Sequence, residues 1–401
     1  MNCSNGISFF VLVTAMARTL TFPFVERTLP WNWYSDPEVL RLEQERIFRR
    51  AWQYAGHTGQ VAEPGSFFSA MAGRTPIVLT RARDGELRAF LNVCRHRGAT
   101  LCLTDAGEAG RSIRCPYHSW TYRLDGSLMS APNWQSMATV DKAGYGLHPV
   151  FLAEWHGLVW LNLADNPAPF EEQMWRQLDY RLGGDRAKFA RYDLAGLVAG
   201  KRVDYTVAAN WKIIQENFQE CYHCATIHPE LVDTLPQFRS LPGGVDATYE
   251  TSGYHFAEDK ASFSVSGDTI LPRLPGLEDR DDRRYFGMVI RPNCFLSLLP
   301  DHVIVHRFEP VSPELTKVVC EWLFPPETVA AHDIGDAVEL FHRVNQQDFA
   351  ASEWCQPNMR SRAYANGGVL VPTEQEIIGR WYYRWYRESM GLERMELGDP
   401  L

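Results

Sequence analysis

The chain has 401 residues, of which 45% are hydrophobic and 22% are charged, and 49 Asp and Glu against 40 Lys and Arg give it a formal net charge of −9 at pH 7. This composition is typical of a globular protein with two or three domains that fold without a disulfide framework. The negative charge argues against a nucleic-acid partner, and no run of about twenty apolar residues predicts a membrane span, so we expect neither nucleic acid nor membrane as a partner.

A short apolar run, from Ile7 to Ala17, lies near the N-terminus. No Lys or Arg precedes it, whereas a secretory signal carries positive charge before its apolar stretch. We therefore interpret the run as the product of an early start codon and expect Met16 as an alternative to Met1. Several of the nine cysteines lie beside histidines, which indicates metal ligation in a reducing compartment, so we expect a cytoplasmic protein.

Three regions follow one another along the chain. Residues 1–52 form an N-terminal segment that is predicted to contain one helix, near Asp36 to Trp52, and to pack on the larger domain that follows. Residues 53–165 divide into short β-type runs separated by Gly, Pro and Asp-Gly pairs, which predicts an all-β domain. Residues 166–401 mix helical and strand-like segments, so this domain and the fold as a whole are predicted to be α+β.

The elements of this larger domain are predicted from periodicity and from turn residues. Helices are expected near 170–180, 211–225 and 338–356, and strands at Phe286 to Leu299 and Val303 to Glu309. The stretch from Pro236 to Arg283 is rich in Gly, Pro, Asp and Ser, which predicts a long loop or insertion.

Two Cys-His pairs lie in the β-type region. Cys94 and His96 are separated by one residue, Cys115 and His118 by two, and eighteen residues lie between the pairs. A Rieske [2Fe-2S] centre places two cysteines on one iron and two histidines on the other, so each pair would supply one ligand to each iron. A structural zinc site is the alternative, but zinc fingers pair their cysteines and histidines separately. The mixed pairs favour the iron-sulfur cluster.

A second constellation contains His223 and His228, five residues apart, with Glu220 three residues before the first histidine and Pro229 after the second. On an ideal helix this spacing turns the two imidazoles about 140° apart, which suits adjacent corners of an octahedron. Two histidines and one carboxylate leave open positions on Fe(II) for O2 and substrate. Each residue taken singly is more often structural, but their position downstream of the cluster motif favours a metal site.

The third ligand of this site is predicted to be Asp348. It lies in the expected helix at 338–356, on the side that carries the apolar residues Leu340, Phe341, Val344 and Phe349. A carboxylate on a buried face costs free energy unless it is paired, and coordination to a metal removes that cost.

Both motifs, and their order, resemble the large (alpha) subunits of the Rieske-type ring-hydroxylating oxygenase family over nearly the whole chain. The runs Cys94 to Gly98 and Cys115 to Trp120 resemble the cluster-binding domain, and Asn217 to His228 resembles the iron-binding motif. Gln347, Asp348 and Glu353 fall in the helix that carries the family's third ligand. Further details resemble the branch that acts on glycine betaine, stachydrine, carnitine or choline, namely Glu220 with Cys221, Tyr222, His223 and Pro229, and Phe295 to Asp301.

The resemblance implies a Rieske domain, a catalytic domain with a helix-grip sheet, and rings of three subunits. It also implies that a separate reductase passes electrons from NAD(P)H to the cluster, with His96 and His118 on the exit side, and that O2 is the co-substrate. Glu220 would bridge a cluster histidine of the next subunit to His223. Asn217 would lie near the iron site.

The expected reaction is hydroxylation of an N-methyl group of a small quaternary ammonium compound such as glycine betaine, giving formaldehyde and a demethylated amine. Aromatic faces recognise such cations, and 12% of the residues are aromatic. Ring dioxygenases usually carry Asp where this chain has Glu220. The alternative substrate is a small aromatic acid, whose carboxylate Arg291 or Arg307 would face. The remote alternative is an electron carrier or a structural zinc protein, which would need no second metal motif.

Two other patterns are interpreted as structural. The aromatic set near the C-terminus has i,i+4 spacing and predicts a helix face packed on the core or on another subunit, through Trp381, Tyr382, Trp385 and Tyr386. Cys221 and Cys224 flank the iron motif and are interpreted as small buried residues, not ligands.

Overall fold

The structure, a computed structural model, describes residues 27–137, 139–239, 253–267, 271–371 and 373–392. The apolar run from Ile7 to Ala17 and the alternative start at Met16 lie outside the described residues, as does part of the predicted loop from Pro236 to Arg283. Within the described ranges, each helix is too short or too polar to cross a membrane.

A short helical segment begins the described chain. A 3-10 turn, η1 (Trp31–Tyr34), is followed by α2 (Pro37–Glu43) and by a π-helical turn, η2 (Gln44–Phe48). The Asp36 side chain caps α2 by accepting a hydrogen bond from the backbone N–H of Glu38, and Pro37 occupies the first turn, where its missing N–H costs nothing. The helix predicted here is confirmed, although it ends four residues before Trp52.

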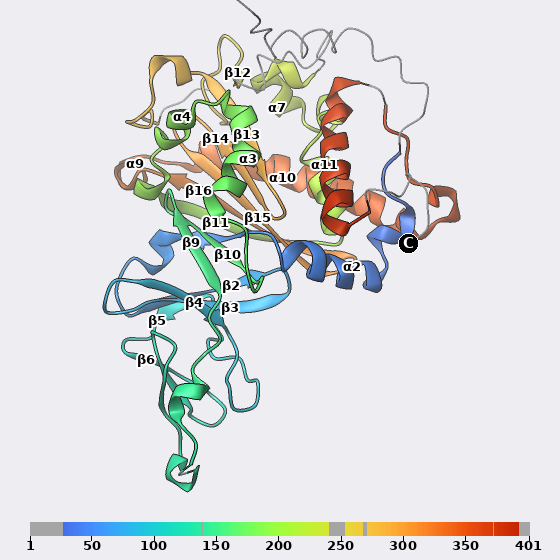
Figure 1. Cartoon of the computed structure of the whole chain (residues 1–401). Helices are drawn as coiled ribbons and strands as arrows, with labels where there is room; N and C mark the ends of the chain where they lie inside the picture. The colour runs from blue at the N-terminus through green and yellow to red at the C-terminus, as the bar shows by residue number, and fades with distance from the viewer. Residues whose placement is uncertain (1–26, 138, 240–252, 268–270, 372, 393–401) are drawn as a thin grey trace, which may run out of the picture.

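Ten strands between residues 53 and 162 form three antiparallel sheets, which confirms the all-β prediction for this region. One sheet has the order β1-β10-β9, with β1 (Gln53–His57), β10 (Leu158–Asn162) and β9 (Phe151–Trp155). A second has the order β4-β3-β2-β5, with β2 (Ser66–Ala72), β3 (Thr75–Arg81), β4 (Leu87–Leu91) and β5 (Ala106–Glu108). The third consists of β6 (Ser112–Arg114), β7 (Thr121–Arg123) and β8 (Leu128–Ser130). The third sheet lies at the end of this β module that projects from the molecule (Figure 1). The first sheet instead packs against the larger part of the chain through Tyr54, Leu158 and Trp160.

The larger part of the chain is built on one six-stranded antiparallel sheet. Its order is β11-β16-β15-β14-β13-β12, with β11 (Val198–Val207), β12 (Tyr254–His255), β13 (Arg284–Ile290), β14 (Cys294–Leu298), β15 (Val303–Ser312) and β16 (Leu315–Phe324). The single strand predicted at Phe286 to Leu299 is divided into β13 and β14. Pro292 lies between them, and a proline cannot donate a hydrogen bond to a strand ladder.

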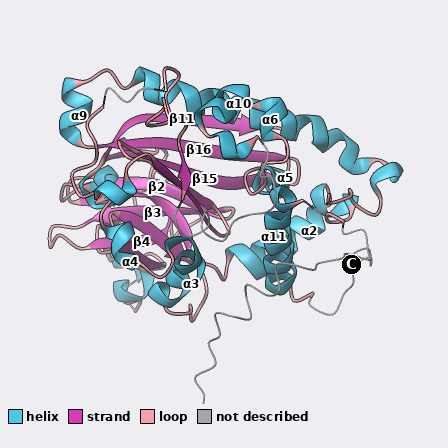
Figure 2. Ribbon diagram, turned by 90° about the horizontal axis from the view of Figure 1, so that it is seen from above, coloured by secondary structure: helices cyan, strands magenta, loops and turns pink. Residues whose placement is uncertain are grey.

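Helices cover both faces of this sheet, as Figure 2 shows for α10 (Gly335–Cys355) on one side and α3 (Phe170–Leu182) and α4 (Arg186–Ala190) on the other. Alternate strand residues point to opposite faces. Leu296, Val305 and Leu323 pack with the apolar side of α3. Ile304, Cys320 and Trp322 pack with Leu340, Phe341 and Val344 of α10. The α+β prediction is therefore confirmed, and helix α10 lies where predicted.

The helix predicted from Trp211 to Ala225 is interrupted. α5 (Trp211–Asn217) ends before Phe218, and α6 (Cys224–Ile227) and α7 (Pro229–Thr234) follow after a turn. In that turn the Glu220 carboxylate accepts a hydrogen bond from the backbone N–H of Tyr222, so this donor is satisfied without a helical partner. The prediction of one continuous helix was wrong, because the Glu220 side chain replaces a helical partner for the backbone N–H of Tyr222.

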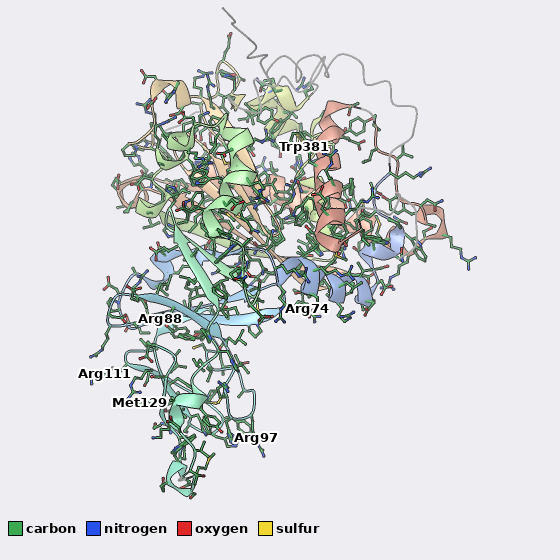
Figure 3. All side chains as sticks on the ribbon, in the orientation of Figure 1. Arg74, Arg88, Arg97, Arg111, Met129 and Trp381 are labelled. Carbon is green, nitrogen blue, oxygen red and sulfur yellow. A yellow bond between two sulfur atoms is a disulfide. The ribbon has the colours of Figure 1, made fainter. Side chains whose placement is uncertain are left out.

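The remaining helices are α9 (Pro326–Ala331) and α11 (Glu374–Met390). On α11, Tyr382 and Tyr386 are fully buried in one cluster with Trp33 and Trp211. The interpretation of the C-terminal aromatic set as a packed helix face is therefore confirmed for these two residues. Trp381, labelled in Figure 3, stays partly exposed on the same helix.

A buried ion pair joins the N-terminal segment to the rest of the fold. Lys212 Nζ on α5 lies 2.7 Å from Glu43 Oε1 on α2, and both side chains are 0% exposed. The indole N–H of Trp211 donates to the other Glu43 oxygen at 2.8 Å, and the Tyr386 hydroxyl donates to Oε1. Burial lowers the pKa of Lys212, and the Glu43 carboxylate opposes this shift. Helices α2, α5 and α11 thus meet at the Glu43 carboxylate, whose two oxygens both have partners.

We expect Lys212→Met to lower the free energy of unfolding by about 3–5 kcal/mol, because it leaves the Glu43 carboxylate buried without a cation. Urea unfolding followed by tryptophan fluorescence measures this change. The matched control is Arg176→Met, which breaks the exposed Arg176–Glu172 pair and is expected to cost less than about 1 kcal/mol. Equal stabilities of the two variants would contradict the role given to the buried pair.

Candidate functional site

Two turns of the β module carry the four predicted cluster ligands. Cys94 and His96 follow β4, and Cys115 and His118 lie between β6 and β7. The backbone N–H of Gly98 donates to the carbonyl of Cys94 at 3.0 Å, and Gly98 has a φ of 74°, which glycine adopts without strain. The tight turn brings the histidine close to the cysteine that precedes it.

The thiols form an inner pair and the imidazoles an outer pair. Cys94 and Cys115 are neighbours and are 3% and 2% exposed. His96 is exposed and His118 half-buried, and their Nδ1 atoms lie 3.1 Å apart. A Rieske cluster needs two thiolates on one iron and two imidazoles on the other, so these four residues fit a [2Fe-2S] cluster whose histidine side faces the surface. Figure 3 shows Arg97, beside His96, on the module away from the six-stranded sheet.

Two aromatic residues that sequence reasoning did not assign a role support this site. The Tyr122 hydroxyl lies 3.4 Å from Cys94 Sγ and accepts a hydrogen bond from the backbone N–H of Arg95 at 3.0 Å. The Trp120 ring stacks on His96, with centroids 5.1 Å apart. Burial raises the pKa of the Cys94 thiol, so a thiolate at this position needs a metal cation nearby. Both aromatic residues follow His118 within four positions, and this closeness in sequence was the signal that could have predicted their role at the cluster site.

The three predicted iron ligands come together from separate segments. His223 precedes α6, His228 joins α6 to α7, and Asp348 lies on α10, and their ligand atoms are all within 4.8 Å of one another. His223 Nε2 is 3.2 Å from both His228 Nε2 and Asp348 Oδ1, and His228 Nε2 is 2.7 Å from the same oxygen. Adjacent donors around an octahedral ion with bonds of about 2.1 Å lie about 3 Å apart, so the three residues fit one Fe(II) on a shared face.

The electrostatics of the site also favour a cation. Burial disfavours the charged form of His223, but hydrogen bonds to Asp348 and Glu220 outweigh it and raise its pKa to about 10. Burial likewise opposes ionisation of Asp348, yet hydrogen bonds from His223 and His228 lower its pKa. A divalent metal would take the place of the protons that these groups share.

The second nitrogen of each imidazole is fixed by a hydrogen bond. Nδ1 of His223 donates to Glu220 Oε1, and Nδ1 of His228 donates to Gln347 Oε1 at 2.7 Å. Gln347 Nε2 in turn donates to Glu230 Oε1 at 2.9 Å. Each bond leaves the Nε2 lone pair free to face the metal. The roles of Gln347 and Glu230 were not predicted, although each lies within two residues of a predicted ligand.

A cavity of about 80 Å³ adjoins the three ligands. Aromatic side chains form much of its wall, namely Phe218, Phe238, Tyr285, Phe295 and Phe341. Asn217, predicted to lie near the iron site, also lines the cavity. Its Oδ1 is buried and has no hydrogen-bond partner among the described residues, so a bound donor would satisfy it.

The two arginines considered for a carboxylate substrate lie elsewhere. Arg291 donates to Gln219 Oε1 at 2.6 Å, and its guanidinium lies 5.6 Å from the centre of the Trp385 ring. Arg307 lies 2.8 Å from Glu309. Among the described residues, the cavity lining includes no arginine. This arrangement does not support the aromatic-acid alternative.

The interpretation of Cys221 as a small buried residue is wrong. Cys221 is half-buried and forms a disulfide with Cys224, which is 3% exposed. Both residues line the cavity. The Cys-x-x-Cys spacing was the signal for this pairing, but the expectation of a reducing compartment argued against it. The turn after α5 brings the two Cα atoms to 5.0 Å, well inside the range of a disulfide.

We expect Asp348→Ala to lose the mononuclear iron and to keep the cluster, because the two sites share no ligand. Iron should fall from about three to about two atoms per chain, while the visible and EPR signals of the reduced cluster stay unchanged. Glu339→Ala, on an exposed turn of the same helix, is the matched control and should keep all the iron. Retention of the third iron in Asp348→Ala would contradict the assignment.

Comparisons with known proteins agree with this pair of sites. Residues 51–141 match the model of the Rieske [2Fe-2S] domain, and residues 194–392 match that of the ring hydroxylating alpha subunit (catalytic domain). The glycine betaine monooxygenase oxygenase subunit of Pseudomonas aeruginosa (strain UCBPP-PA14) is 28% identical, over 90% of this chain and 89% of that protein. The carnitine monooxygenase oxygenase subunit of Escherichia coli (strain K12) is 30% identical, over 86% and 87%.

A solved structure of the quaternary ammonium Rieske monooxygenase CntA in complex with L-carnitine is similar over most of its length. It has a TM-score of 0.69 and 25% identity, and the match covers 91% of this chain and 96% of that one. The four predicted cluster ligands lie within the first matched range, and Glu220 and the three predicted iron ligands lie within the second. The chain therefore belongs to the family of Rieske-type ring-hydroxylating oxygenase alpha subunits, oxidoreductases that carry a Rieske [2Fe-2S] cluster and a mononuclear iron and use O2 with electrons supplied from NAD(P)H through a reductase.

Proposed function

We propose that this oxygenase hydroxylates an N-methyl group of a small quaternary ammonium compound such as glycine betaine. The observation that carries the proposal is the cavity beside the metal triad. Its wall contains four phenylalanines, one tyrosine and the carboxylates of Glu220 and Asp348 and, among the described residues, neither lysine nor arginine. A quaternary ammonium offers no N–H to donate, so aromatic faces and nearby carboxylates are the groups that attract it. The named relatives act on glycine betaine and carnitine, which supports the same substrate class.

The roles of the residues follow from their chemistry. Cys94, His96, Cys115 and His118 hold the cluster, and His223, His228 and Asp348 hold the iron. When bound, the iron supplies the activation of O2 needed to hydroxylate a C–H bond. Glu220 and Gln347 keep both imidazoles oriented, and the aromatic wall holds the cation and excludes water.

The products follow from the instability of the hydroxylated cation. An N-methyl group, O2, two electrons and two protons give an N-hydroxymethyl cation and water. This cation loses formaldehyde and a proton, and its C–N electron pair returns to nitrogen as a tertiary amine.

The proposal includes the organisation of the protein in the cell. Residues 53–165 form the Rieske domain, residues 166–401 the catalytic domain, and residues 1–52 a segment that packs on the latter. The chain is a cytoplasmic homotrimer in which the cluster of one subunit reduces the iron of the next. The exposed histidine side of the cluster, at the end of the β module that projects from the rest of the chain, supports transfer between subunits (Figure 1).

We expect formaldehyde when the dithionite-reduced protein meets O2 and glycine betaine, carnitine or choline in a single-turnover assay. The amount should approach one molecule per chain for the best substrate, and Asp348→Ala, measured alongside, should give none. Benzoate serves as the comparison substrate for aromatic-acid chemistry. Hydroxylated benzoate together with no formaldehyde from any quaternary ammonium compound would contradict the proposed substrate class.

We expect Glu220→Gln to keep both metal sites filled and to slow turnover by about 10–100-fold, because the amide lacks the charge that orients His223 and links it to the cluster. Stopped-flow spectroscopy of cluster reoxidation by O2 and substrate measures the electron-transfer step directly. Glu339→Gln, which changes an exposed carboxylate paired with Arg343, is the control and should reoxidise at the wild-type rate. Wild-type reoxidation in Glu220→Gln would remove Glu220 from the electron path.

A further inference from the structure

The disulfide between Cys221 and Cys224 closes a short loop of the chain that contains the iron ligand His223. Cys224 Sγ lies 3.9 Å from His223 Nε2, the nitrogen that faces His228 and Asp348 at 3.2 Å. The sulfur atom is therefore next to the donor that would bind the metal. A species released from that metal meets this sulfur as one of its first protein groups.

Both cysteines also line the cavity that adjoins the three ligands. Cys221 is half-buried, whereas Cys224 is almost fully buried, so the pair lies at the boundary between the cavity and the surface. The two Cα atoms are 5.0 Å apart in a short turn, a separation at which a dithiol and a disulfide interconvert without a large backbone movement. The position favours a reactive pair over an inert structural bond.

We propose that Cys221 and Cys224 form a redox-active pair that consumes hydrogen peroxide released in the cavity when O2 is reduced without substrate hydroxylation. This inference rests on the proposed iron site. Uncoupled reduction converts O2, two electrons and two protons into hydrogen peroxide. One thiol attacks the peroxide, which breaks the O–O bond and yields a sulfenic acid and water, and the second thiol then displaces a second water to form the disulfide. The two thiols lose two electrons and two protons in total.

The reactivity of Cys221 and Cys224 can be compared with that of the other cysteines in the same chain. Among the described residues the free cysteines are Cys94, Cys102, Cys115, Cys294 and Cys320, which are buried, and Cys355, which is exposed. If reactivity followed exposure alone, Cys355 would be oxidised before the half-buried pair. If it follows distance from the iron, the pair is oxidised first.

The experiment uses the full chain, purified without oxygen, treated with a thiol reductant and then freed of it. Iron is quantified before the reaction. Dithionite reduces the metal centres and is then removed, because it converts O2 to hydrogen peroxide by itself. O2 is added without substrate, remaining thiols are alkylated, and peptide mass spectrometry reports the state of each cysteine. We expect the peptide that contains Cys221 and Cys224 to lose both alkylatable thiols before Cys355 is oxidised. The Asp348→Ala variant, which lacks only the mononuclear iron, should keep them.

Two results would overturn the inference. One is iron-loaded protein whose pair stays reduced while Cys355 is oxidised, and the other is equal oxidation of the pair in wild type and Asp348→Ala. A wild-type protein that contains the cluster but no third iron would instead overturn the proposed function, and the iron measurement detects this separately.

A variant tests what the pair does for the enzyme. Cys221→Ser cannot form the disulfide, and we expect it to lose iron faster than wild type during uncoupled reduction, because peroxide then persists beside the ligands. Cys355→Ser is the matched control and should lose iron at the wild-type rate. Equal iron loss in Cys221→Ser and wild type would show that the pair does not protect the site.

Discussion

The Asp348 carboxylate faces two imidazoles, with Oδ1 3.2 Å from His223 Nε2 and 2.7 Å from His228 Nε2, and the arrangement of the surrounding helices depends on this convergence. A buried carboxylate is tolerated only where cations or donors compensate it. Helix α10 supplies the carboxylate and is fixed on the sheet by Phe341 and Val344. The chain around His223 and His228 must then reach the same oxygen, which it does through the turn that separates α5 from α6. The interruption between α5 and α6 is thus what allows both histidines to reach Asp348.

The cluster site differs from the iron site because one side of it is exposed. Its thiols are buried and its imidazoles reach the surface in the part of the β module that lies away from the six-stranded sheet (Figure 1). Glu220 is half-buried, bonded to the iron ligand His223, and followed by Tyr222, which is 51% exposed. The proposed electron path therefore leaves one subunit at a surface imidazole and enters the next at Glu220, close to the surface, before it reaches the iron ligand His223.

A buried histidine, His306, lies behind the aromatic wall of the cavity, and its burial sets its charge. His306 pairs across the sheet with Phe295, its ring lies 5.2 Å from that of Phe218, and its Nε2 lies 2.9 Å from Asn345 Oδ1. Burial lowers the pKa of His306 to about 4, so this imidazole is neutral at physiological pH. This histidine therefore adds no positive charge behind the aromatic wall of the cavity.

The ligand types and the order of the two sites could be predicted from the sequence alone, because Cys-x-His, Cys-x-x-His and paired histidines are local patterns whose chemistry is set by side-chain type and spacing. The fold class followed from the periodicity of each region. The end of helix α5 and the hydrogen bonds through which Gln347 and Glu230 hold His228 became known only from the fold, as did the position of the Cys221–Cys224 disulfide beside all three iron ligands. Those features depend on contacts between residues far apart in the chain, or on a side chain competing for backbone hydrogen bonds, and neither is encoded in local periodicity.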